Sequence, residues 1–274
     1  MRYTEGHIEL DIMKPFEQIP ASAKKNIRYV LTDIDDTLTN RGRLPAVVFS
    51  AMERLKAAGI VTIPITGRPA GWCDHIARMW PVEGLVGENG AFYFRYDESQ
   101  KKMRRRYFKS AEQRAADRRR LEKLKQQILQ AIPGCRVSAD QAYREADLAI
   151  DYCEDVPRLP QQDIDAVVAC FVRAGARAKV SSIHINGWFG DYDKFTMTGI
   201  LFEEAFGRRL ADIREQVIYT GDSPNDGPMF AYFPHSVGVA NVRNFEGRMD
   251  CYPTWVVAQE GGCGFAEMVD ILLA

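Results

Sequence analysis

Apolar residues recur along the first third of the chain in two alternating patterns. Residues 27–34 and 59–66 are nearly continuous apolar runs, which are typical of strands buried on both faces of a parallel sheet. Between them, residues 45–58 carry apolar side chains at helical spacing. A further helix is predicted from Pro69 until Pro81 stops it, followed by a short strand at 84–87. This order of elements predicts βαβ units.

The pattern changes between about residues 97 and 187. Ser110 is followed three residues later by Gln113, which predicts a capping box at the start of a long amphipathic helix. Shorter pieces follow, predicted as strands at 135–138, 146–153 and 178–185 and as a helix at 161–174. These residues predict a small, separate α+β unit.

After residue 190 the alternation of helix and strand resumes. Helices are predicted at 195–206, 228–232 and 265–273, and strands at 216–220 and 236–240. We therefore predict an α/β fold: a doubly wound parallel-sheet core made of residues 1–95 and 188–274, with an α+β cap domain inserted at 96–187. Residues 1–26 are polar and aperiodic, and are expected to form an extension without chemistry of its own.

Composition adds the expectation of a soluble cytoplasmic protein. The 274 residues are 46% hydrophobic and 27% charged, with a formal net charge of −1 that favours neither nucleic acid nor acidic partners. The six cysteines form no C-x-x-C pair, so neither a zinc site nor a disulfide framework is predicted. No apolar run approaches the length of a membrane span.

Three acidic residues, Asp33, Asp35 and Asp36, are crowded at the end of the first predicted strand. In an open parallel sheet, ligands bind beyond the carboxyl ends of the strands. Asp33 and Asp35 are two residues apart and can face one pocket, and two such carboxylates need a cation or a shared proton to offset their repulsion. Asp222 and Asp226 follow a later strand. Together these acids suggest a divalent metal bound by oxygen ligands.

Four motifs in this order resemble those of the haloacid dehalogenase (HAD) superfamily of phosphohydrolases. They are "DIDDT" at 33–37, "ITGR" at 65–68, Lys194 at the head of a helix, and "GDSPND" at 221–226. The longest interval separates the second motif from the third, so the cap lies between them. That placement, with "GENGAFYF" just ahead of it, is similar to subfamily IIB, which includes sugar-phosphate, sucrose-phosphate and mannosylphosphoglycerate phosphatases and phosphomannomutases.

The resemblance implies an activity and a role for each matched residue. The activity is magnesium-dependent hydrolysis of a small phosphorylated metabolite, expected to be a sugar phosphate. Asp33 is implied as the nucleophile that becomes an aspartyl phosphate, and Asp35 as the general acid and base. The implied phosphate-binding residues are Thr66, Gly67, Lys194 and Asn225. The implied magnesium site is formed by Asp33, Asp222 and the backbone carbonyl of Asp35, with Asp226 in support.

The sequence departs from the family pattern at one position, and three further residues are candidate substrate contacts. Asp36 stands where many relatives have glycine. His184, Asn186 and Trp188 lie where the cap returns to the core and are candidates for contact with the leaving group, although strand packing is an equally good explanation.

Other interpretations remain open. The same intermediate would serve a phosphomutase that passes the phosphoryl group to a sugar hydroxyl. A different class is a non-catalytic protein that binds nucleic acid or an acidic partner through residues 101–125, which carry twelve lysines and arginines against three acids. We regard a solvated cap helix as the better explanation of this basic segment, because no stacking aromatic residue repeats through it.

Overall fold

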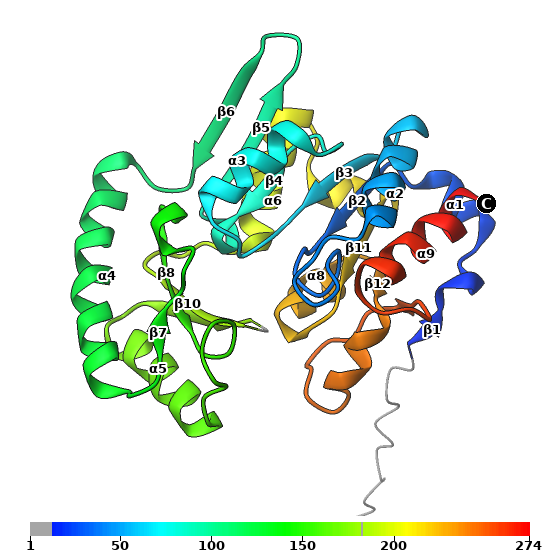
Figure 1. Cartoon of the computed structure of the whole chain (residues 1–274). Coiled ribbons are helices and arrows are strands. Elements are labelled where there is room, and N and C mark those ends of the chain that lie inside the picture. Colours follow the sequence, from blue (N-terminus) through cyan, green and yellow to red (C-terminus); the bar gives the residue numbers. More distant parts are fainter. Residues whose placement is uncertain (1–12, 182) are drawn as a thin grey trace, which may run out of the picture.

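A parallel sheet of six strands, with the helices that pack on it, forms the larger part of the molecule (Figure 1). The computed structural model describes residues 13–181 and 183–274. The strand order is β1-β13-β12-β11-β2-β3, and each neighbouring pair is parallel. The strands are β1 (Lys14–Pro15), β2 (Tyr29–Thr32), β3 (Val61–Pro64), β11 (Val217–Gly221), β12 (His235–Gly238) and β13 (Trp255–Val256).

Helices cover both faces of this sheet, and each face has its own apolar core. Val30 and Leu31 are adjacent on β2, so their side chains point to opposite faces, and they belong to two different buried clusters. The helices are α1 (Ala21–Asn26), α2 (Ala46–Ala57), α3 (Ala70–Met79), α6 (Lys194–Leu201) with a π-helical turn (Phe202–Phe206), α7 (Leu210–Ile213), α8 (Gly227–Tyr232) and α9 (Gly261–Leu273). The predicted doubly wound α/β fold is confirmed.

The N-terminal extension takes a larger part in the fold than the sequence indicated. β1 adds an edge strand to the parallel sheet beside β13, and Phe16 and Ile19 are buried in the core. Two residues of strand are too short to leave a periodic pattern, which explains why none was recognised. Residues 1–12 of the extension lie outside the described residues.

A second sheet is a meander that projects from the main sheet (Figure 1). It consists of β4 (Leu85–Gly87), β5 (Phe92–Asp97) and β6 (Lys102–Tyr107), which pair antiparallel. β4 touches the parallel sheet through a single bridge between Ile65 and Val86. The strand predicted at 84–87 therefore begins a separate sheet, and β5 crosses the boundary expected at residue 96.

The third sheet lies with two helices on the other side of the molecule from α9 and the C-terminus (Figure 1). Its antiparallel order is β7-β8-β10-β9. The elements are α4 (Ala111–Ala131), β7 (Arg136–Val137), β8 (Asp147–Asp151), α5 (Gln161–Arg173), β9 (Arg177–Val180) and β10 (His184–Trp188). α4 begins with the predicted Ser110–Gln113 capping box. The strand predicted at 178–185 is in fact two strands.

This third sheet has its own apolar core, which includes Leu121, Ile150, Val167, Phe171 and Ile185. We propose that it and its helices form the cap domain inferred from the sequence, and we call this unit the cap below. In the part of the chain that the structure describes, no helix is both long and apolar enough to span a lipid bilayer.

Candidate active site

Two neighbouring strands bring the predicted acids to one edge of the parallel sheet. β2 and β11 pair in parallel register, and Asp33 and Asp222 are the residues that directly follow Thr32 and Gly221. The backbone N–H of Asp33 donates to the carbonyl of Thr220 at 2.9 Å, which continues the strand pairing up to the acid itself. The carboxyl ends of both strands thus present their acids together, as expected for an open α/β sheet.

Asp33, Asp222 and Asp226 form a compact, buried acidic cluster. One carboxylate oxygen from each lies within 4.8 Å of those of the other two. Lys194 is the cation beside them: its Nζ lies 2.6 Å from Asp33 Oδ1 and 3.5 Å from Asp226 Oδ1. It also donates to the Asn225 amide oxygen at 3.4 Å. Three acids therefore share one lysine.

The electrostatics of this cluster favour a further positive charge. Burial raises the pKa of Asp33 to about 7, Lys194 opposes that shift, and Asp226 and Asp35 add to it. Burial also raises the pKa of Asp222 well above its usual range, with contributions from Asp226 and Asp33. The Lys194 ammonium keeps its proton, because these carboxylates raise its pKa despite its burial. A hard divalent cation fits this set of oxygen donors and would relieve their repulsion.

Asp226 is held in place by three donors as well as by the lysine. The Tyr219 hydroxyl donates to its Oδ1 at 2.5 Å, and the backbone N–H groups of Asp222 and Ser223 donate to its Oδ2. These bonds fold the loop after β11 around one carboxylate, which positions Asp222. Tyr219 lies within an apolar strand, so the pattern of the sequence does not distinguish it from a core residue.

Asp35 lies beside the cluster and is paired with a different cation. Arg68 Nη2 and Nε contact Asp35 Oδ1 at 2.6 and 2.8 Å. The expected contact of Asp35 with magnesium through its backbone carbonyl stays a prediction. The next residue, Asp36, has φ +56°, in the left-handed region that glycine adopts most easily and that aspartate tolerates.

Thr66 and Gly67 form the loop that follows β3. Thr66 is fully buried, and its hydroxyl accepts the backbone N–H of Arg68 at 3.0 Å. Gly67 lines the cavity above the acids, and a Cβ there would come within 3.2 Å of the Asn89 side chain. Arg68, on which the sequence favoured no single role, joins this loop to Asp35.

Gly90 packs against the backbone at the start of the helix that carries Lys194. Its φ is +106°, and a Cβ on this residue would stand 2.1 Å from the carbonyl oxygen of Asp193. The turn after β4 can therefore pack directly against the start of α6. Asp193 caps that helix by accepting the backbone N–H of Thr196 at 2.8 Å.

A cavity lies between these core residues and the cap. Its core wall includes Asp33, Asp35, Gly67, Arg68, Lys194, Asp222 and Asn225, and its cap wall includes Arg144, Lys179, Ser181, His184 and Asn186. Of the three candidate leaving-group contacts, His184 and Asn186 line this cavity, whereas Trp188 lines an adjacent one together with Lys179 and Lys194.

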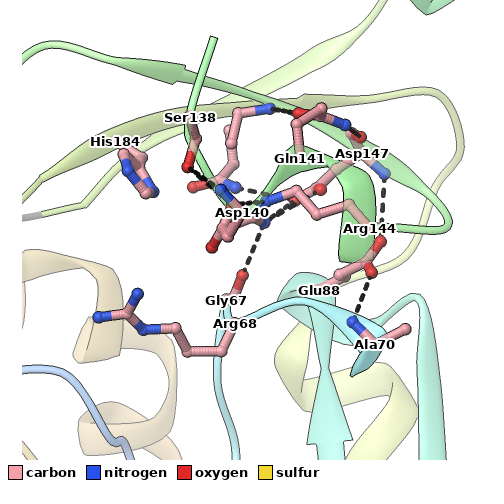
Figure 2. A network of polar contacts seen from close by, with 12 residues as sticks. Gly67, Arg68, Ala70, Glu88, Ser138, Asp140, Gln141, Arg144, Asp147 and His184 are labelled. Atoms are coloured by element: carbon pink, nitrogen blue, oxygen red, sulfur yellow. Dashed lines mark hydrogen bonds and ion pairs between the residues drawn. The ribbon is translucent and has the colours of Figure 1, made fainter. Parts of the chain in front are cut away.

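The cap is joined to the core by a buried polar network around Glu88 and Arg144 (Figure 2). Glu88 Oε1 accepts the backbone N–H groups of Ala70 and Glu145, and its Oε2 accepts those of Ala146 and Asp147, at 2.6–3.2 Å. Arg144 donates to the Gly67 carbonyl at 3.0 Å and to the carboxylates of Asp140 and Asp147. One core carboxylate thus receives three consecutive amides of the cap.

Replacing Glu88 should therefore loosen the cap. In Glu88→Gln, one carboxylate oxygen becomes an NH2 group that faces backbone donors instead of accepting from them. We expect the free energy of unfolding to fall by about 1–3 kcal/mol, the cost of buried donors left unpaired. Denaturant unfolding measures this, with the exposed Glu98→Gln as control. Equal stability of the two variants would contradict the role assigned to Glu88.

Comparison with known proteins agrees with this geometry. A family model described as haloacid dehalogenase-like hydrolase matches residues 30–145. The resemblance to the haloacid dehalogenase family is thereby confirmed. The match also supports the prediction of a phosphatase-like hydrolase. No curated protein matched the sequence significantly.

Solved structures share the haloacid dehalogenase-like fold over most of their length. A protein of Thermoplasma acidophilum has a TM-score of 0.68 at 18% identity, over 90% of this chain and 98% of its own. The sucrose-phosphatase of Synechocystis sp., solved with sucrose and phosphate, gives 0.61 at 13%, over 89% and 97%. A HAD subclass IIB sugar phosphatase gives 0.61 at 14%, over 89% and 98%. At these identities the likeness establishes the fold.

Proposed function

We propose that the protein is a magnesium-dependent phosphatase that cleaves a small phosphate monoester, a sugar phosphate in the first instance, through an aspartyl-phosphate intermediate. The observation that carries this proposal is the buried group of Asp33, Asp222, Asp226 and Lys194 at the end of the sheet, facing a cavity that core and cap residues line together. The similarity in fold to the sucrose-phosphatase and to the subclass IIB sugar phosphatase supports the choice of substrate class.

Asp33 is the proposed nucleophile. An ionised carboxylate attacks phosphorus without a base to activate it, and Lys194, 2.6 Å away, holds Asp33 in place and offsets charge on the phosphoryl oxygens. Gly67 and Asn225 line the cavity, and the loop that begins at Thr66 and the Asn225 amide would receive the remaining phosphoryl oxygens. Bound magnesium, held by Asp33 and Asp222 with support from Asp226, would supply charge neutralisation and in-line alignment.

Asp35 is the proposed proton donor to the leaving alkoxide, and afterwards the base toward the attacking water. Its carboxylate is paired with Arg68, and both residues line the cavity. The Arg68 guanidinium also lies 3.9 Å from Glu154 of the cap, which in turn contacts His184 at 2.8 Å. The proposed acid is therefore connected to the cap through charged side chains.

Replacing Asp35 tests this division of roles. Asp35→Asn cannot give or take a proton, so turnover should fall by about two orders of magnitude or more. With an aryl phosphate, whose leaving group needs no protonation, the aspartyl phosphate should accumulate, because its hydrolysis still lacks a base. Acid-quench trapping of labelled phosphate on the protein measures it. A trapped fraction no greater than in the unaltered enzyme would contradict the role in hydrolysis.

A panel of phosphate monoesters assayed with and without magnesium tests the proposed function directly. We expect magnesium-dependent release of inorganic phosphate, and activity that persists in excess chelator would exclude the mechanism. Transfer of the phosphoryl group to another hydroxyl of the same sugar would favour the phosphomutase alternative.

The structure gives less support to the nucleic-acid alternative. The basic segment is divided between β6 and α4, and several of its cations are paired: Arg104 with Asp97, Arg105 with Asp74, Arg106 with Glu204, and Lys109 and Arg120 with Asp117. These pairs reduce the charge available for phosphate backbones. Steeply salt-dependent binding of DNA or RNA would revive this alternative.

A further inference from the structure

Lys179 of β9 brings a positive charge from the cap to the catalytic cavity. It pairs with Asn186 across the β9–β10 ladder, and residues directly opposite in a ladder point to the same face of the sheet. Lys179 lines the catalytic cavity and the two cavities that adjoin it, one of them bordered by Trp188 and the other by Tyr152. It therefore stands where the three spaces meet.

Lys179 differs from the other cations of the catalytic cavity because it lacks a protein partner. Arg68 is paired with Asp35, Arg144 with Asp140 and Asp147, and Lys194 with Asp33. In residues 13–181 and 183–274, the Lys179 side chain makes no hydrogen bond or ion pair, and only its backbone takes part in the β9–β10 ladder. Burial lowers the pKa of Lys179, the neighbouring Lys194 lowers it further, and Asp226 opposes the shift. Asp226 already accepts from Tyr219 and two backbone amides.

A second donor lines the same space. The Asn89 side chain is about nine-tenths buried, and its Nδ2 has no hydrogen-bond partner among the described residues. Asn89 lines the catalytic cavity and the cavity next to it, and Lys179 lines both as well. Buried donors without acceptors are costly, so an ammonium and an amide that face one space favour an anionic ligand there.

We propose that Lys179, with the Asn89 amide, binds a second anionic group on the substrate, a carboxylate or a further phosphate carried by the leaving group. This inference rests on the proposed function. The phosphoryl group to be transferred must contact Asp33 in the core, where Lys194 already offsets its charge. Lys179 is on the opposite, cap wall, so the group that meets it belongs to the alcohol. The preferred substrates are then anionic beyond their reacting phosphate.

Two pairs of candidate substrates, whose members differ by one anionic group, test this proposal. 3-Phosphoglycerate differs from glycerol 3-phosphate by a carboxylate in place of a hydroxymethyl group, and fructose 1,6-bisphosphate differs from fructose 6-phosphate by a second phosphate. The unaltered enzyme should have the higher kcat/KM for the more anionic member of at least one pair, and which pair responds identifies the group. In Lys179→Gln this preference should fall by about 10- to 100-fold, as expected for loss of a charged hydrogen bond.

Matched controls keep the result specific. Lys179→Arg should retain most of the preference, and Lys123→Gln, an exposed lysine on α4, should leave it unchanged. Hydrolysis of p-nitrophenyl phosphate, which has no second anion, should change by less than about threefold in Lys179→Gln. If that activity falls as much as the others, Lys179 acts on the transferred phosphoryl group and the proposal is wrong. An unchanged ratio within both pairs also overturns it.

A binding measurement separates this proposal from the proposed function. Titration calorimetry in the Asp33→Asn background compares the members of each pair without turnover. Tighter binding of the more anionic member, lost in Asp33→Asn/Lys179→Gln, supports the anion site even if the unaltered protein hydrolyses none of these esters. Equal binding of both members overturns it. Since the Lys179 side chain has no hydrogen-bond or ion-pair partner in the part of the chain that the structure describes, Lys179→Gln should melt no lower than the unaltered protein, and a lower melting temperature would instead indicate a structural role.

Discussion

Replacing Asp33 by asparagine should reduce turnover by at least about three orders of magnitude while the protein stays folded. An amide has no charged oxygen to attack phosphorus, so the covalent intermediate cannot form. The fold should tolerate the change, because burial and two neighbouring acids already disfavour the ionised form of Asp33. Lys194 would keep Asp226 as a partner at 3.5 Å. Phosphate release from an aryl phosphate measures the loss of activity, and the melting temperature reports on the fold.

Asp250→Asn is the control for this experiment, because Asp250 is an exposed acid outside the cavity. It should retain full turnover. Asp33→Asn should in addition fail to incorporate label from substrate, whereas the unaltered enzyme quenched in acid should carry it. Near-normal turnover of Asp33→Asn with magnesium present would remove Asp33 from the mechanism and leave the site without a nucleophile.

The sequence predicted the sheet and its acids because both depend on local signals. Buried parallel strands are continuous apolar runs, and a residue that follows such a run lies at the carboxyl edge of the sheet. Asp33 and Asp222 could therefore be placed together although they are far apart in the chain. The order of the motifs then indicates that Lys194 is a site residue and not an ordinary lysine in the first turn of a helix.

The contacts between cap and core could not be predicted in this way. Glu88 accepts amides of residues 145–147, and Arg144 reaches the Gly67 carbonyl, so each pairing depends on how two units dock. The sequence "GENGAFYF" contains Glu88, but its pattern indicates the subfamily and not this contact. Nothing local distinguishes Arg144 or Lys179 from other basic residues of the cap. Arg144 is buried and Lys179 is partly buried, and only the folded chain shows this difference.

The same reason limited what could be said about individual side chains in the site. His184, Asn186 and Trp188 alternate along one strand, yet the first two line the catalytic cavity and Trp188 lines the adjacent one. Asn186 also donates to Asp147 at 2.8 Å, so it takes part in the docking network as well as in the cavity wall. Because these three residues are every second residue of β10, the sequence predicts that they share one face of the strand. Which cavity each of them lines depends on how the cap packs on the core.

Magnesium should stabilise the protein without substrate, and more strongly at pH 8 than at pH 5.5. The pKa of Asp33 in the metal-free protein is raised from 3.8 to about 7, so the folded state holds a proton that the unfolded state has lost. The resulting stability is fully present below pH 4 and is lost as the pH rises through 7. Magnesium requires ionised ligands, so it must displace this proton at pH 5.5 but not at pH 8.

Thermal unfolding with and without magnesium at the two pH values measures this difference. At about 100 times its dissociation constant, magnesium should add about 2.7 kcal/mol and raise the melting temperature at pH 8 by roughly 5 °C or more. Asp222→Asn removes a ligand and should abolish most of the shift, whereas Asp250→Asn should retain it. A shift of equal size at both pH values, or one that survives in Asp222→Asn, would show that the metal binds elsewhere than at Asp33, Asp222 and Asp226.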